Sequence, residues 1–258
     1  LKQVLQRLRL NNLKAKMSKC DFFKVELKYL GHIVSRSGIK PDPAKVQILT
    51  GWPQPRSVHD VRSFLGLTNY FRKFIQGYAV LARPLTDLLK GLDKKDRKGR
   101  LQRWHRMSPS LEEDNRQAFL ARWTDRCQQA FDQLKQILTA PPVLVLPDFD
   151  QPFELVCDAA SEHPPGIGAV LLQSGHPVAF YSRKLSSAEE NYTIQEQEML
   201  AVVSALSEFR CYLEGSTFTV ITDHQPNTYL QSMTINKRRA RWLEQTSCFN
   251  YRWVYRPG

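Results

Sequence analysis

The sequence contains no apolar run near eighteen residues, the length that a membrane-spanning helix requires. Its five cysteines are scattered, and no two of them form a CxxC pair. This spacing argues against a disulfide framework and a cysteine zinc site, and it indicates reduced thiols in the cytoplasm or nucleus. No signal peptide is visible at Leu1. We therefore expect a soluble piece of a longer polypeptide that does not interact with a membrane.

Acidic residues are the minority, because 37 Lys and Arg residues face 25 Asp and Glu residues, which gives a formal net charge of +12. The imbalance belongs to one part of the chain. Residues 1–150 contain 28 basic and 14 acidic residues, whereas residues 151–258 contain 9 basic and 11 acidic residues. The sequence therefore indicates a first part that binds phosphates and a second part that can gather metal ions.

Local signals predict a mostly helical first part and an α/β second part. Asp42 precedes a proline at a first helical position, and Ser57 with Asp60 and Thr193 with Glu196 have capping-box spacing. The apolar periodicity predicts a hairpin within residues 20–34, helices at residues 1–13, 43–50, 61–75, 81–89, 123–138, 194–213 and 236–245, and strands at residues 153–158, 167–173, 177–183, 217–223 and 249–257.

Three carboxylates stand where this predicted structure changes. The strand FELVCDA closes on Asp158, and the strand FTVITDH closes on Asp223. Between them, Glu198 lies at the edge of the apolar stripe of the helix at residues 194–213, so we expect its carboxyl to be half-buried. Any one of these acids alone is also explained as a strand-end cap or a solvated residue.

Three carboxylates brought together repel one another unless a cation joins them. Oxygen ligands from Asp and Glu suit Mg²⁺ or Mn²⁺, and two such ions commonly hydrolyse a phosphodiester. The spacing alone does not decide between a metal-dependent nuclease and three unrelated surface acids. The residues around the three carboxylates favour the nuclease.

Those surrounding residues resemble a known family. CDAAS, GIGAVLLQ, HPVAFYSRKLS, AEENYTIQEQEMLAVV, YLEGSTFTVITDHQPNTYL and RRARWLEQ, in this order, resemble the ribonuclease H domain of gypsy-type long-terminal-repeat retrotransposon polyproteins. Upstream, YLGHIVSRSGIKPDPAKV and VRSFLGLTNYFRKFI look like the palm end and the thumb of the same family's reverse transcriptase.

The resemblance implies an α/β (α+β) fold with four consecutive parts. Residues 1–40 would end the reverse-transcriptase palm, and residues 41–90 would form the thumb. Residues 91–150 would form a charged insertion and a connector. Residues 151–258 would form a ribonuclease H-like mixed five-stranded sheet with flanking helices.

The family's catalytic set corresponds to Asp158, Glu198 and Asp223, which would hold two Mg²⁺ or Mn²⁺ ions. Asp158 would bridge both ions, Glu198 would bind the ion near the leaving oxygen, and Asp223 would bind the ion that activates water. The implied reaction cleaves the RNA strand of an RNA–DNA hybrid, while the upstream part of the full-length polyprotein polymerises DNA.

The implied partners are an RNA–DNA hybrid, a template–primer duplex and the rest of the polyprotein, in cytoplasmic virus-like particles or the nucleus. In the family, the segment at Gly31 and His32 is similar to the primer grip. A turn histidine with satisfied hydrogen bonds explains His32 as well, and a solvated basic face explains the arginines. The candidate nucleic-acid contacts are Gly31, His32, Tyr70, Arg72, Lys73, Arg183, Arg238, Arg239 and Arg241.

Several features depart from the family pattern. Residues 91–122 form a charged insertion that we expect to be partly helical and mobile, and SEHPPG lengthens the turn after Asp158. The family's fourth carboxylate would follow YRPG, and the polymerase aspartates would precede Leu1. We therefore keep a second hypothesis, a catalytically inactive nucleic-acid-binding remnant of a degenerate or domesticated element. A scaffold interaction module is a third.

Overall fold

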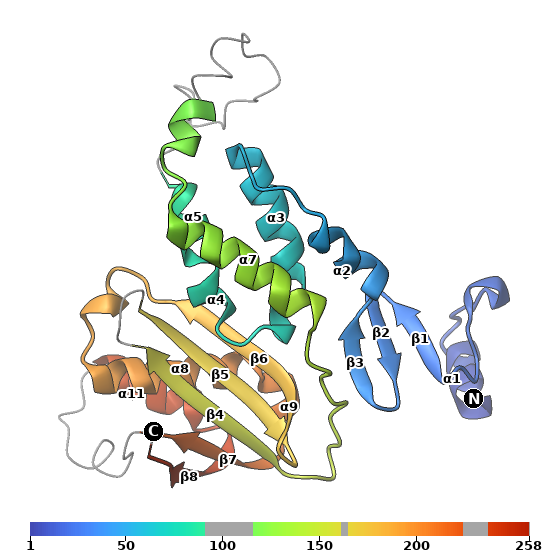
Figure 1. Cartoon of the computed structure of the whole chain (residues 1–258). Helices are drawn as coiled ribbons and strands as arrows, with labels where there is room; N and C mark the ends of the chain where they lie inside the picture. The colour runs from blue at the N-terminus through green and yellow to red at the C-terminus, as the bar shows by residue number, and fades with distance from the viewer. Residues whose placement is uncertain (91–115, 161–164, 224–236, 258) are drawn as a thin grey trace.

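The computed structural model describes residues 1–90, 116–160, 165–223 and 237–257 (Figure 1). At the N-terminus, helix α1 (Lys2–Leu10) buries none of its side chains, and the short 3₁₀ helix η1 (Met17–Lys19) follows it. The predicted hairpin is confirmed as β1 (Glu26–Tyr29) and β2 (His32–Ser35), and β3 (Gly38–Pro41) extends it into a three-stranded antiparallel sheet.

A helical unit, residues 43–90 and 116–139, follows this sheet. Asp42 and Ser57 cap α2 and α3 as predicted, because each side chain accepts a backbone N–H of the first turn. The helix predicted to reach Ile75 instead ends at Tyr70 and gives way to a 3₁₀ turn. The helices are α2 (Pro43–Thr50), α3 (Val58–Tyr70), η2 (Arg72–Phe74), α4 (Tyr78–Leu81), α5 (Arg83–Leu88) and α7 (Asp125–Thr139).

The predicted insertion at residues 91–122 ends inside this helical unit. Residues 116–120 are helical, and Phe119 is 2% exposed in the core, near Trp123 and Phe131. The helical part of the expectation is therefore confirmed at residues 116–120, whereas the expected mobility does not suit them, because the buried Phe119 ring anchors them to the core. Residues 91–115, including the KKDRKGR cluster, lie outside the described part of the chain.

A sheet unit, residues 153–160, 165–223 and 237–257, confirms the predicted five-stranded mixed sheet. The strand order is β6-β5-β4-β7-β8, in which β4, β5 and β6 are antiparallel and β7 and β8 continue in parallel with β4. The strands are β4 (Phe153–Ala160), β5 (Gly166–Gln173), β6 (His176–Lys184), β7 (Thr217–Thr222) and β8 (Asn250–Tyr255).

The helices of the sheet unit pack on this sheet and on one another (Figure 1). Helix α8 starts with the predicted capping box of Thr193 and Glu196, and it ends at Glu208. The predicted helix at residues 194–213 is thus divided, because Phe209 leaves the helical conformation between α8 and α9. These elements are η4 (Glu189–Asn191), α8 (Ile194–Glu208), α9 (Arg210–Leu213) and α11 (Lys237–Thr246).

Two apolar cores, one in each unit, meet along β6. Elements η2 and α4 pack against β6, and Phe180 of that strand contacts the core of the helical unit. The Oγ of Ser182 accepts a hydrogen bond from the backbone N–H of Ala79 at 2.9 Å. The connector between the units pairs Leu144 with Ile39, and it thereby ties the N-terminal sheet to the same assembly.

Candidate active site

Asp158 and Asp223 lie at the same end of the sheet, because Asp158 is near the end of β4 and Asp223 directly follows the last residue of the neighbouring parallel strand β7. Strands β4 and β7 pair with Val156 opposite Ile221, and each aspartate follows that pair by two residues. Side chains two residues apart on a strand point to the same face. Both aspartates are exposed at this end, so their carboxyls remain accessible to a ligand.

Glu198 reaches the same region from α8, which packs across β4 and β5. It is 8% exposed, so the expectation of a half-buried acid is wrong; α8 is enclosed by the sheet on one side and by α11 on another. Burial, followed by the charges of Asp223 and Asp158, raises the pKa of Glu198 to about 8. Its buried Oε2 has no hydrogen-bond partner within the described residues. Such a group requires a proton or a cation.

The neighbours of Glu198 show the same mutual influence. Burial, and then the charge of Asp223, raises the pKa of Asp158, and a hydrogen bond from the backbone N–H of Ala159 opposes this rise. Burial raises the pKa of the Cys157 thiol, and the charges of Glu198 and Asp158 add to the effect. The carboxyls therefore lie within one another's electric field, and Cys157 stays a protonated core thiol.

The donor atoms of these residues suit a divalent metal ion, but their spacing does not form a complete metal site. Across residues 1–90, 116–160, 165–223 and 237–257, no three Asp, Glu, His or Cys side chains are grouped closely enough to hold one metal ion. The donors are nevertheless all carboxylates, and one of them carries an unpaired buried oxygen. A hard divalent cation takes such oxygen donors and would remove the repulsion that raises their pKa values.

The residues similar to a primer grip lie at the contact between the N-terminal sheet and α3. Tyr70 donates its hydroxyl proton to the carbonyl oxygen of Leu30, and Nδ1 of His32 lies 2.7 Å from the same oxygen. The His32 ring packs against Tyr70, Phe71 and Phe74. Burial, and then the charge of Lys73, lowers the pKa of His32. His32 thus makes the turn contact of the simpler alternative through Nδ1, but its buried Nε2 has no hydrogen-bond partner among the described residues.

The two basic candidates after α3 have different environments. Arg72 is about half-exposed and pairs with Glu208 of α8 across the junction, with Nη2 and Oε1 3.5 Å apart. Lys73 lies over the ring of Phe74, 5.3 Å from its centroid, and burial lowers the pKa of its ammonium group. Lys73 is thus a partly desolvated cation at the surface where Gly31 and His32 lie.

The remaining basic candidates are mostly occupied by acids of the sheet unit. Arg183 donates two hydrogen bonds to Glu189, at 2.8 and 3.1 Å. Arg238 and Arg239 both approach Glu196, at 3.0 and 3.8 Å. Arg241 is exposed on α11. The sequence predicted the capping-box position of Glu196 but not its ion pairs with Arg238 and Arg239. These pairs join residues far apart in the chain, which local patterns do not reveal.

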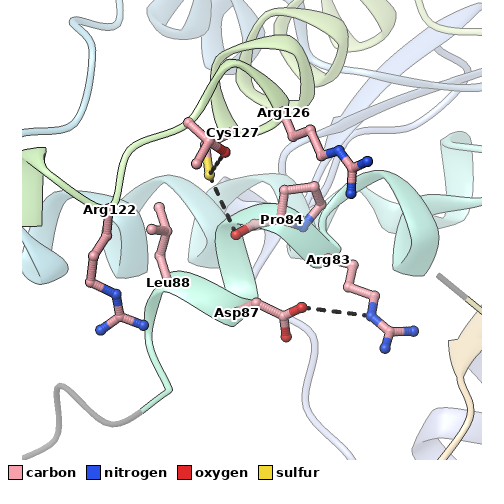
Figure 2. Close-up of a pocket in the computed structure, with 8 residues that line it drawn as sticks. Arg83, Pro84, Asp87, Leu88, Arg122, Arg126 and Cys127 are labelled. Atoms are coloured by element: carbon pink, nitrogen blue, oxygen red, sulfur yellow. Dashed lines mark hydrogen bonds and ion pairs between the residues drawn. The ribbon is translucent and has the colours of Figure 1, made fainter. Parts of the chain in front are cut away.

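A pocket of about 740 Å³ lies elsewhere, between α5 and α7 (Figure 2). Three arginines line it, but Arg83 is paired with Asp87 and points away from Arg122 in the close-up. The buried Cys127 contacts the carbonyl oxygen of Pro84. None of the three candidate catalytic carboxylates lines this pocket, so it is not part of the acidic site.

Comparisons of sequence identify the relatives of the chain. Residues 123–220 match a family model described as an RNase H-like domain found in reverse transcriptase. The Pol polyprotein of the transposon gypsy from Drosophila melanogaster is 38% identical over 250 residues, covering 96% of this chain and 22% of that protein. The Tf2-3 transposon polyprotein of Schizosaccharomyces pombe is 35% identical over 268 residues, covering 100% of this chain and 18% of that protein.

Solved structures show the same fold. A foamy viral protease-reverse transcriptase in complex with RNA/DNA hybrid has a TM-score of 0.71 and 16% identity, covering 99% of this chain and 33% of that one. A foamy viral protease-reverse transcriptase dRH in complex with ds DNA has a TM-score of 0.70 and 16% identity, covering 99% and 42%. Within the described residues, no helix is both long and apolar enough to cross a bilayer.

The family match starts at residue 123, upstream of the predicted boundary at residue 151, so that boundary stays a prediction. Ribonuclease H-like domains of Pol polyproteins generally use divalent metal ions, in keeping with the carboxylate donors described above. The chain spans about a fifth of the length of the curated relatives it matches. It belongs to the Pol polyproteins of gypsy-type retrotransposons, and it carries their ribonuclease H-like domain.

Proposed function

We propose that this part of the polyprotein cleaves the RNA strand of RNA–DNA hybrids, with Asp158, Glu198 and Asp223 as the catalytic carboxylates. The observation that carries the proposal is the placement of Asp158 and Asp223 at one end of β4 and β7, near Glu198, whose buried Oε2 has no hydrogen-bond partner among the described residues and whose pKa their charges help to raise. Three unrelated surface acids would not perturb one another in this way.

The three side chains would hold two Mg²⁺ or Mn²⁺ ions, which when bound polarise the phosphodiester and activate water. The strand-end aspartates face the solvent and can meet the substrate from outside. Glu198 would contribute a carboxylate oxygen to these ions from the buried side, where the sheet and α11 exclude water. The expected products are an RNA 3′-hydroxyl and a 5′-phosphate.

The substrate would be held by the basic part of the chain as well as by the sheet unit. Gly31, His32, Tyr70 and Lys73 lie together on one surface, and Arg72 lies at the junction. Duplex binding through phosphates would follow from the excess of basic residues in the first 150 positions.

The test uses a labelled RNA–DNA hybrid with Mg²⁺ or Mn²⁺. We expect the chain to cut the RNA strand and to leave duplex DNA intact. Asp158→Asn should abolish cutting while hybrid binding persists. Glu154→Gln, a carboxylate change on the same strand but outside the acidic site, should cut at the wild-type rate. Unchanged cutting by Asp158→Asn would refute the assignment.

A second function, hybrid binding without cleavage, is favoured by one observation. The three carboxylates are not gathered around a common point among the described residues. If the wild-type chain binds hybrid with a steep salt dependence but never cuts it at any Mg²⁺ or Mn²⁺ concentration, this inactive remnant is the better description.

A further inference from the structure

Glu196, in the first turn of α8, is a buried carboxylate with two sets of partners. Its Oε2 accepts hydrogen bonds from the backbone N–H and the hydroxyl of Thr193, at 3.2 and 3.3 Å. Its Oε1 accepts a hydrogen bond from Nη1 of Arg238 at 3.0 Å, and Nη2 of Arg239 lies 3.8 Å away. The Glu196 side chain is only 10% exposed. One residue thus ties the start of α8 to the start of α11.

Aromatic contacts reinforce this connection. The guanidinium of Arg238 lies 3.8 Å from the ring centroid of Tyr192, just before α8. Trp242, one turn further along α11 and 6% exposed, packs against the same Tyr192 ring with centroids 6.2 Å apart. Gln197 donates a hydrogen bond to the carbonyl oxygen of Tyr192 at 3.1 Å. The helix start is therefore held by charge, stacking and apolar packing together.

Residues two apart on a helix lie about 200° apart around its axis, so Glu196 and Glu198 point to opposite sides of the same turn. We propose that Glu196 and Arg238 are positioning residues, which fix this turn and thereby hold the Glu198 carboxyl in place beside Asp158 and Asp223. This inference rests on the proposed function and assigns Arg238 to alignment of the site in place of phosphate contact.

Metal binding gives the sharpest test, because it needs no cleavage. Mn²⁺ is titrated into the full chain by calorimetry. Loss of a residue that orients a metal ligand typically weakens the affinity for the metal about tenfold or more. We expect this loss for both Glu196→Ala and Arg238→Ala. If charge alone mattered, removing the acid would weaken Mn²⁺ binding whereas removing the arginine would strengthen it. Opposite signs would overturn the proposal.

A phosphate-contact role for Arg238 makes a different prediction. Such a role would lower hybrid affinity, reduce the salt slope of binding by about one, and leave Mn²⁺ affinity unchanged. We expect that pattern for Arg241→Ala, an exposed position on the same helix. The phosphate-contact pattern in Arg238→Ala would likewise contradict the proposal.

Two further variants separate positioning from loss of stability. Glu196→Gln keeps an oxygen acceptor and is compatible with a capping box, so it should restore most of the Mn²⁺ affinity. Gln173→Ala removes a buried side chain whose hydrogen bonds go to backbone atoms of Asp148 and Gln151 and not to α8 or α11. It should lower the melting temperature without changing Mn²⁺ affinity. An equal loss of Mn²⁺ affinity in Gln173→Ala would mean that Glu196 acts through stability alone.

The two proposals can fail separately. If the wild-type chain binds Mn²⁺ and the Glu196 and Arg238 variants lose this binding, but the wild-type chain never cuts hybrid, the positioning role stands and the nuclease proposal falls. If Asp158→Asn abolishes cutting while Glu196→Ala keeps both wild-type Mn²⁺ affinity and wild-type kcat, the nuclease proposal stands and the positioning role falls.

Discussion

Arg83 on α5 and Glu190 on η4, 107 positions apart in the sequence, form an ion pair with Nη2 and Oε1 3.3 Å apart. The same guanidinium donates from Nη1 to the carbonyl oxygen of Pro165 at 3.1 Å. The Arg83 side chain is 17% exposed and that of Glu190 is 37% exposed, so the arginine is largely shielded from water whereas its acidic partner is partly solvated. Arg83 therefore fastens the helical unit to the sheet unit.

Removing the Arg83 side chain should make the two units unfold less cooperatively. We expect Arg83→Ala to lower the free energy of unfolding by about 1 kcal/mol, because one part-buried and one solvent-screened hydrogen bond from the guanidinium are lost. Hydrogen exchange at residues 165–190 should increase. Arg122→Ala, a change on the same pocket wall but away from the sheet unit, should leave that exchange unchanged. Equal protection in both variants would contradict the assignment.

Gly38 marks the closest approach between β3 and the connector. Its φ of +128° is unfavourable for other residues, and a Cβ there would lie 2.2 Å from the carbonyl oxygen of Leu144. We expect Gly38→Ala to destabilise the chain by about 1–3 kcal/mol in urea unfolding. Gly51→Ala, where nothing lies within 4 Å, should change stability by less than about 0.5 kcal/mol. Similar losses in both variants would show that steric clash with Leu144 is not the cause.

Leu30 is a second backbone outlier, at the two-residue turn between β1 and β2. Its φ is +46°, followed by +70° at Gly31, and its side chain is 68% exposed. Asparagine prefers this turn conformation, so Leu30→Asn should stabilise the chain by about 1 kcal/mol. An exposed apolar residue in a strained turn is a candidate for a contact with another molecule. We therefore expect the same variant to weaken binding to template–primer duplex. Tighter binding would argue against a contact through Leu30.

The raised pKa of Glu198 predicts a pH-dependent stability in the absence of divalent ions. Below pH 4.5 the carboxyl is protonated in both the folded and the unfolded chain. Between about 4.5 and 8 the folded chain retains a proton that the unfolded chain has released, so stability falls as the pH rises. The urea midpoint in EDTA should therefore decrease across this window, and Mg²⁺ should restore it.

Glu198→Gln should flatten this slope and unfold at higher urea than wild type at pH 8, because no buried carboxyl remains to ionise. Glu154→Gln on β4 should keep the wild-type slope. A wild-type midpoint that rises with pH in EDTA would show that the burial of Glu198 is compensated by another group.

Local chemistry explains which elements could be predicted from the sequence. The caps at Asp42, Ser57 and Thr193 act within a few residues, and the structure confirms all three. The same local signals failed at the ends of α3 and α8. Tertiary packing decides those ends, because Phe71 and Phe209, which directly follow the two helices, bury their rings in the two cores.

Long-range contacts explain what the sequence could not show at the site. The partner of Arg238 lies 42 positions away, and that of Arg72 lies on another unit. The depth of Glu198 depends on α11, which follows it by many residues. A pattern of spacing places a side chain on a face of its own element, but burial depends on the neighbours that cover this face.

Strand β6 is the outer strand of its sheet, and the helical unit covers it with η2 and α4. Cutting the polypeptide between the units would uncover Phe180 and a row of backbone groups able to recruit another sheet. The sheet unit released alone should therefore precipitate or dimerise edge to edge, so we expect the helical unit also to keep its neighbour soluble.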